Sequence, residues 1–141
     1  MALYKVTEHP FTITMSGNGS AESPYVITNS SQIREVGYDP TKNYVLNSNV
    51  SMTNETPILF GSEINNFTGT FDGNNHTISN IKSTGTIKGG LFGNNTGTIK
   101  NLNISNSNIK VYYEAGLVAG TNQGLVENVN VNNVTLTGLN D

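Results

Sequence analysis

Apolar residues alternate with polar residues in short runs along much of this chain. Leu102-Asn-Ile104 and Val129-Asn-Val131 place apolar side chains two residues apart, which is the spacing of a β-strand with one buried face. Helical spacing is scarce, with one exception at residues 30–37, where a Ser cap, apolar residues three apart and a terminal Gly occur together. We therefore expect short strands throughout and one short helix over residues 30–36.

The alternating runs recur along the chain. Three segments read apolar, polar, Asn, apolar, namely His76–Ile81, Thr98–Ile104 and Leu125–Val131. Their separation of roughly 20–27 residues is typical of solenoid repeats. Three short strands per unit, joined by Gly and Asn turns, predict an all-β fold: a right-handed parallel β-helix of about five or six coils. Pro24–Ile27 is the predicted N-terminal capping strand.

Equivalent positions in stacked coils should form ladders of like side chains. Stacked amides can hydrogen-bond along the stack, so we expect a structural ladder at the repeated Asn position, formed by Asn80, Asn101 and Asn128. The same alignment predicts apolar ladders of Ile78 with Ile99 and Val126, of Ile81 with Leu102 and Val129, and of Leu91 with Leu117.

Composition narrows the function classes. The 141-residue chain has a net charge of −3 and scattered basic residues, which argues against a dedicated nucleic-acid binder. The sequence offers no apolar run long enough to insert in a membrane, and its lack of Cys excludes disulfides and thiolate metal sites. We expect no cofactor and no metal.

The first residues differ from the repeats. Leu3–Thr7 and Phe11–Thr14 alternate like a strand outside the array, so we expect an N-terminal arm at residues 1–15 and a β-helix domain at 16–141. The first ten residues lack the apolar core and cleavage site of a secretory signal peptide. This predicts a protein that stays in the cytoplasm, leaves by lysis, or is a fragment.

The repeat region resembles a known family. The stretch from Phe67 to Ile78 looks like the start of a GLUG-type repeat array, and residues 89–102 are similar to the GLUG motif almost throughout. The resemblance implies a β-helix like those of haemagglutinin-like bacterial adhesins and some phage proteins. It implies no catalytic residues, because the motif is structural.

Local motifs offer few chemical groups. Asp72-Gly73-Asn74 lacks the series of acidic positions of an EF-hand and is predicted to be a turn. Tyr112 and Tyr113 interrupt the repeat, which predicts a bulge or loop there. An exposed Tyr on a flat sheet can stack on a sugar or anchor a partner, so these two residues are the candidate binding residues.

Three functions are compatible with these features. A polysaccharide-degrading enzyme needs paired carboxylates, which the repeat region does not offer in register. The favoured interpretation is a non-enzymatic phage virion component, a head decoration or a tail protein that contacts a receptor. The alternative is a fragment of a bacterial cell-surface adhesin, located at the cell surface or outside the cell. Partners would be a virion or surface protein, a glycan or a host receptor. We also expect a homo-oligomer or docking on a larger assembly, through the N-terminal arm and a C-terminal coil that needs a cover.

Overall fold

The computed structural model describes residues 12–53, 64, 66–82, 86–88, 91–114 and 116–138. Most of them form β-strands, and one short α-helix and one 3-10 turn complete the regular structure of this part of the chain. The elements are β1 (Tyr25–Ile27), α1 (Ser30–Glu35), η1 (Val36–Tyr38), β2 (Asn43–Leu46), β3 (Val50–Ser51), β4 (Thr70–Asp72), β5 (Thr77–Ser79), β6 (Thr86–Lys88), β7 (Phe92–Asn95), β8 (Thr98–Glu114), β9 (Ala119–Asn122) and β10 (Leu125–Gly138). The prediction of an all-β protein is confirmed, and the predicted short helix near residues 30–36 is present as α1.

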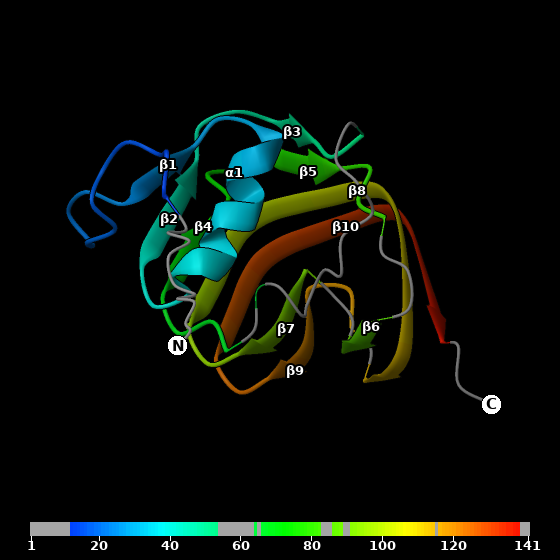
Figure 1. Cartoon of the computed structure of the whole chain (residues 1–141). Coiled ribbons are helices and arrows are strands. Elements are labelled where there is room, and N and C mark those ends of the chain that lie inside the picture. The colour runs from blue at the N-terminus through cyan, green and yellow to red at the C-terminus, as the bar shows by residue number, and fades with distance from the viewer. Residues whose placement is uncertain are drawn as a thin grey trace, which may run out of the picture.

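The named strands pair in parallel throughout the described residues. Five of them lie side by side in the order β1, β2, β4, β8, β10 (Figure 1). Tyr44 pairs with Phe71 and Phe71 with Ile99, so each strand meets its equivalent one repeat further along the chain. A second row runs from β3 through β5 to the middle of β8. Strands β7 and β9 form a separate two-stranded parallel sheet.

Two strands are much longer than the sequence predicts. Strand β8 has 17 residues and β10 has 14, and both follow the same bent path side by side (Figure 1). The bends coincide with Asn residues in the left-handed backbone conformation: Asn101 and Asn106 in β8, Asn128 and Asn133 in β10. Asn tolerates positive φ better than most residues, so it can turn a strand without ending the hydrogen-bonded ladder.

The apolar ladders follow the parallel register. Ile99 pairs with Val126 and Leu102 with Val129, as predicted, and Leu102 is fully buried. The placement of Ile78 beside Ile99 is wrong, because Ile78 pairs with Ile104, which lies on the next segment of β8. The position beside Ile99 is taken by Phe71 of β4.

Two further register predictions are also wrong. The backbone nitrogen of Ile81 donates to the hydroxyl of Ser107, so Ile81 does not lie beside Leu102. Phe92 pairs with Ala119, which leaves Leu91 opposite Val118 rather than Leu117. These errors share a cause. Each repeat contains two apolar–Asn–apolar segments, and an alignment of short sequence segments cannot tell which of the two is matched.

Aromatic rings fill the interior near the N-terminal half of the stack. Tyr44 packs against Tyr25 and Phe67 with ring centroids 5.6 and 6.3 Å apart, and Phe67 packs against Phe92 at 4.9 Å. Phe71 meets Phe92 edge to face at 5.5 Å. These contacts connect successive turns of the chain through side chains as well as through backbone hydrogen bonds.

A column of glycines marks one corner of the stack. A Cβ on Gly97 would collide with the carbonyl oxygen of Gly69, and a Cβ on Gly124 would collide with that of Gly97. The backbones approach closely here because they are joined by hydrogen bonds. The backbone nitrogen of Thr98 donates to the carbonyl oxygen of Gly69, and that of Leu125 donates to the carbonyl oxygen of Gly97, both at 2.9 Å. Only glycine fits where the corners stack at this distance.

The N-terminal end of the stack is covered by α1 and the residues that precede β1. Asn29, rather than the predicted Ser30, caps the helix, because its side chain accepts a hydrogen bond from the backbone of Gln32. Met15 is buried in the core, and Thr14 donates from its backbone and hydroxyl to the carboxylate of Glu35. Residues 14 and 15 therefore pack as part of the body, whereas residues 1–11 of the proposed arm lie outside the described residues.

Candidate functional site

Asn101 and Asn128 form the amide ladder expected of them. The side-chain nitrogen of Asn128 donates to the side-chain oxygen of Asn101 at 2.8 Å. Asn101 in turn donates to the carboxylate of Asp72 at 3.2 Å, so Asp72 ends this ladder. The ladder orders one corner of the stack and keeps one carboxylate oxygen of Asp72 occupied.

Asn80 lies in a different column, and its assignment to the same ladder is wrong. Its backbone nitrogen donates to the carbonyl oxygen of Ser105, and its amide donates to the hydroxyl of Ser51 at 2.9 Å. Because Ser79 pairs with Ser105, the equivalent of Asn80 in the next repeat is Asn106. The residues do share one property, since Asn80, Asn101 and Asn128 all have a positive φ.

Further amide ladders were missed by the sequence interpretation. Four more Asn-to-Asn hydrogen bonds join residues 27 or 28 positions apart: Asn66 with Asn94, Asn95 with Asn122, Asn103 with Asn130, and Asn106 with Asn133. A search for Asn pairs at that spacing would have found them. Three of these four pairs lie on the outer surface as ordered amides, whereas Asn95 of the fourth is fully buried.

Tyr112 and Tyr113 belong to the end of β8, but their side chains lie outside the described residues. The backbone there is irregular as predicted. Thr86 pairs with Val111 and Lys88 pairs with Glu114, so β8 carries one more residue than β6 between these two pairs. The bulge is confirmed, and the role of the two tyrosines in binding stays a prediction.

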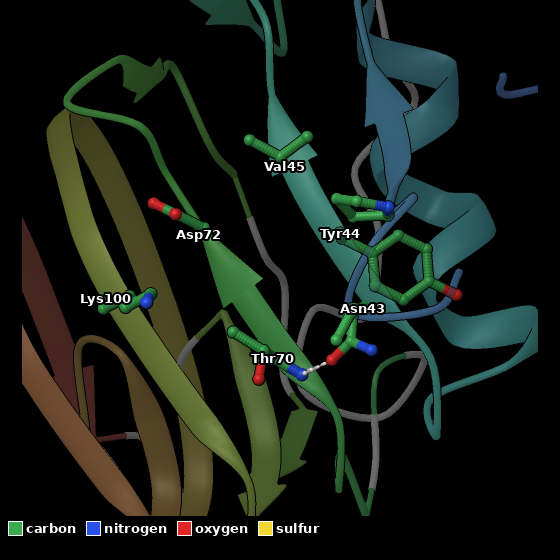
Figure 2. A pocket seen from close by; sticks show the side chains of 8 residues that line it. Asn43, Tyr44, Val45, Thr70, Asp72 and Lys100 are labelled. Carbon is green, nitrogen blue, oxygen red and sulfur yellow. Dashed lines mark hydrogen bonds between the residues drawn. The ribbon is translucent and has the colours of Figure 1, made fainter. Parts of the chain in front are cut away.

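A hollow of about 280 Å³ lies on the outer face of β2, β4 and β8 (Figure 2). Sequence analysis did not find it, because its rim combines strand residues with the loop that precedes β1. It is lined by Ala21, Pro24, Asn43, Tyr44, Val45, Thr70, Asp72 and Lys100. The hollow is the candidate binding site.

Several polar groups at the hollow are held by the fold itself. The side chain of Asn43 accepts a hydrogen bond from the backbone of Thr70 at 3.1 Å (Figure 2) and donates to the carbonyl oxygen of Gly19 at 3.0 Å. Asp72 accepts from the backbone of Asn74 at 2.8 Å through the same oxygen that Asn101 contacts. That contact confirms the turn predicted at residues 72–74.

Other polar groups there are available to a ligand. Among the described residues, no hydrogen bond or ion pair engages the ammonium group of Lys100, the hydroxyl of Thr70 or the second oxygen of Asp72. The site thus combines a cation, a hydroxyl and a carboxylate oxygen on one face. This set suits hydroxyl groups or a carboxylate on a ligand.

The ring of Tyr44 serves the core rather than the hollow. Its hydroxyl donates to the carbonyl oxygen of Asp39 at 2.6 Å. Burial raises the pKa of Tyr44 well above its usual value, and the nearby charge of Asp39 adds to the effect. The ring is therefore no stacking platform for a sugar.

Within the described ranges, no three His, Cys, Asp or Glu side chains gather where they could hold a metal ion. No helix among the described residues is long and apolar enough to cross a membrane.

Comparison with known proteins gives one informative similarity. A segment of Halomucin from Haloquadratum walsbyi is 36% identical to this chain over 121 residues, which covers 77% of the chain. The chain spans about 1% of the length of Halomucin. No family model matches the chain, and no solved structure matches it.

Proposed function

We propose that this chain is a right-handed parallel β-helix that acts as a non-enzymatic binding module at the cell surface or outside the cell. The observation that carries the proposal is the regular register. Phe71 pairs with Ile99 and Ile99 with Val126, so equivalent residues of successive repeats stack in parallel strands. We call each stacked turn of the chain a rung.

The bent strands support a coil rather than a flat sheet. Strand β8 pairs with β4 near its start and with β5 in its middle, so one strand contributes to two faces. The change of face comes after Asn101, whose positive φ turns the chain. Parallel crossovers are right-handed in nearly all known cases, which is the reason for the proposed hand. We also propose that the rungs are GLUG-type repeats, on the similarity of residues 89–102 to that motif.

The hollow beside Lys100 is the proposed ligand site. Its free cation, hydroxyl and carboxylate oxygen, within a surface of ordered amides, suit a hydrated and hydroxyl-rich ligand such as a polysaccharide. Catalysis has less support. Glycoside hydrolysis needs two carboxylates across the scissile bond, whereas Asp72 is flanked in its column by Val45 and Lys100.

A surface location has more support than a virion. The similarity to Halomucin, which is a mucin by name, favours an extracellular or surface setting. One of the two grounds for the virion interpretation was an N-terminal arm at residues 1–15 that docks on a scaffold. Ile13 and Met15, at the end of that arm, pack against the core.

Binding of acidic and neutral polysaccharides to the full chain, followed by NMR saturation transfer, tests the proposal. Lys100→Met and Thr70→Val should each weaken binding, by about fivefold for a lost polar contact. Lys82→Met is the matched control, because Lys82 is exposed and does not line the hollow. The absence of binding to every polysaccharide, or depolymerisation that Asp72→Ala abolishes, would refute the proposal.

A further inference from the structure

Two opposite charges stand side by side in the hollow on β2, β4 and β8. Asp72 of β4 and Lys100 of β8 are register partners on neighbouring strands (Figure 2), which lie about 4.8 Å apart. Both side chains are partly buried, and they form no ion pair within the part of the chain that the structure describes. The hollow therefore offers a carboxylate acceptor and an ammonium donor within reach of one small chemical group.

The carboxylate of Asp72 is oriented by the fold. Its Oδ1 accepts a hydrogen bond from the backbone nitrogen of Asn74 at 2.8 Å and another from the side-chain nitrogen of Asn101 at 3.2 Å. Its Oδ2 accepts none from the described residues and is left for a ligand. A group that is held in place in this way loses little conformational entropy when a ligand binds to it.

The charges around Lys100 disfavour an anionic ligand. In its outward column, Lys100 is flanked by Asp72 on one neighbouring strand and by Glu127 on the other. A ligand carboxylate beside the ammonium group would also lie near these two carboxylates, whose repulsion opposes the attraction of the single cation. An uncharged hydroxyl group avoids this repulsion, because it can donate to a carboxylate and accept from an ammonium group.

The size and the apolar lining of the hollow suit one sugar ring. Ala21, Pro24 and Val45 supply apolar surface, against which the C–H groups of a sugar can pack. The volume of about 280 Å³ lies just below the range of about 300–1,000 Å³ that is typical of pockets for drug-sized ligands. A single ring fits this space better than a longer oligosaccharide does.

We propose that the hollow binds one uncharged sugar ring through two adjacent hydroxyl groups, one donating to Oδ2 of Asp72 and the other accepting from the ammonium group of Lys100. The inference rests on the proposed polysaccharide-binding function and specifies its ligand. Hydrogen bonds to charged groups are the strong ones, so this pair provides most of the affinity. The hydroxyl of Thr70, on the same face, is placed to bind a third oxygen of the ring.

Dextran, mannan and galactan are the neutral probes, because each is uncharged and carries adjacent free hydroxyl groups, and polygalacturonate is the acidic probe. At least one neutral polymer should bind the full chain more tightly than polygalacturonate does in isothermal titration calorimetry. Periodate cleaves bonds between adjacent hydroxyl-bearing carbons. Treatment of that polymer with periodate, followed by borohydride reduction, should therefore abolish its binding while leaving it uncharged.

Two charge variants separate the contact from the repulsion. Asp72→Asn keeps an oxygen acceptor for Asn74 and Asn101 but replaces Oδ2 by an amide nitrogen, so binding of the neutral polymer should weaken by about tenfold or more. Glu127 does not line the hollow. Glu127→Gln should therefore leave binding of the neutral polymer unchanged, and should raise the affinity for polygalacturonate by about two- to fivefold because one repulsion is removed. Circular dichroism checks that both variants are folded.

The inference is overturned if polygalacturonate binds more tightly than every neutral polymer, or if the periodate-treated polymer keeps its affinity. It is equally overturned if Asp72→Asn leaves binding of the neutral polymer unchanged, or if Glu127→Gln leaves the affinity for polygalacturonate unchanged. In each of these cases the proposed polysaccharide-binding function survives, whereas a failure to bind acidic and neutral polysaccharides alike refutes both.

Discussion

The side-chain amide of Asn128 donates to the side-chain oxygen of Asn101, in the preceding repeat, at 2.8 Å. Both residues have a positive φ, so each turns its strand at the same corner of the stack. One residue type therefore serves two purposes: it adopts the left-handed conformation that the corner needs and joins the corners of successive rungs.

Substitution of Asn101 separates these two purposes. Asn101→Ala removes the hydrogen bonds to Asp72 and from Asn128 and places at φ 54° a residue that tolerates the left-handed conformation less well than Asn does. The free energy of unfolding should fall by about 2–3 kcal/mol. Asn101→Gly removes the same bonds without the strain and should cost about 1 kcal/mol less. Urea unfolding measures both, and equal losses would show that the backbone conformation contributes nothing.

The stability lost when a side chain of an apolar ladder is truncated should depend on which rung carries it. Leu102→Ala should lower the free energy of unfolding by about 2–5 kcal/mol, because the residue is fully buried. Val129→Ala, its register partner on the last rung, should cost about 1 kcal/mol since that side chain is only partly buried. Thermal and urea unfolding of the two variants check this order, which a reversed ranking would contradict.

The glycine corner should not accept a methyl group. Gly97→Ala places a Cβ against the carbonyl oxygen of Gly69 and the backbone of Thr68, which cannot move without breaking the pairing of rungs. Unfolding should become easier by about 3 kcal/mol or more. Thr96→Ala, an exposed neighbour, is the control and should change stability little. Similar stabilities of the two variants in calorimetry would disprove the close approach.

Tyr44 should make the fold sensitive to alkali. Burial raises the pKa of its hydroxyl above the value of about 10 in the unfolded chain. The neutral form is therefore favoured by folding, so this stabilisation is complete below about pH 10 and declines as the pH rises above it. Tyr44→Phe should lose about 1 kcal/mol at neutral pH with the bond to Asp39, and should show a shallower decline above pH 10. Urea unfolding from pH 8 to pH 12 measures this, and parallel profiles for the two proteins would contradict it.

The sequence predicted the elements better than their register. Alternation at Leu102-Asn-Ile104 correctly marks two buried residues, because side chains of a strand alternate between faces whatever its partner. It does not predict which strand comes next to it. Ile78 pairs with Ile104 and Phe71 pairs with Ile99. The number of residues between the partners differs between these two pairs, because it depends on loop lengths that local patterns do not specify.

The candidate site was less predictable than the fold. Thr70, Asp72 and Lys100 look like ordinary outward residues of strands, and nothing in their local sequence marks a hollow. The site exists because Ala21 and Pro24, in the loop before β1, rise beside these strands in the folded chain. Tyr112 and Tyr113 were noticed because they interrupt a repeat, which is a signal of irregular backbone and only indirectly of binding.

Engineered disulfides test most directly the parallel register on which the proposed β-helix depends. The chain has no Cys, so a pair introduced at Thr98 and Leu125 can be followed by mass spectrometry without interference. These residues are register partners on the outer face, and neighbouring parallel strands lie about 4.8 Å apart, within disulfide range. Thr98→Cys with Leu125→Cys should oxidise to an intramolecular disulfide. Lys100→Cys with Leu125→Cys should not, because a shift of two residues separates the Cα atoms by about 8 Å. Equal oxidation of both pairs, or oxidation of the shifted pair alone, would contradict the proposed β-helix.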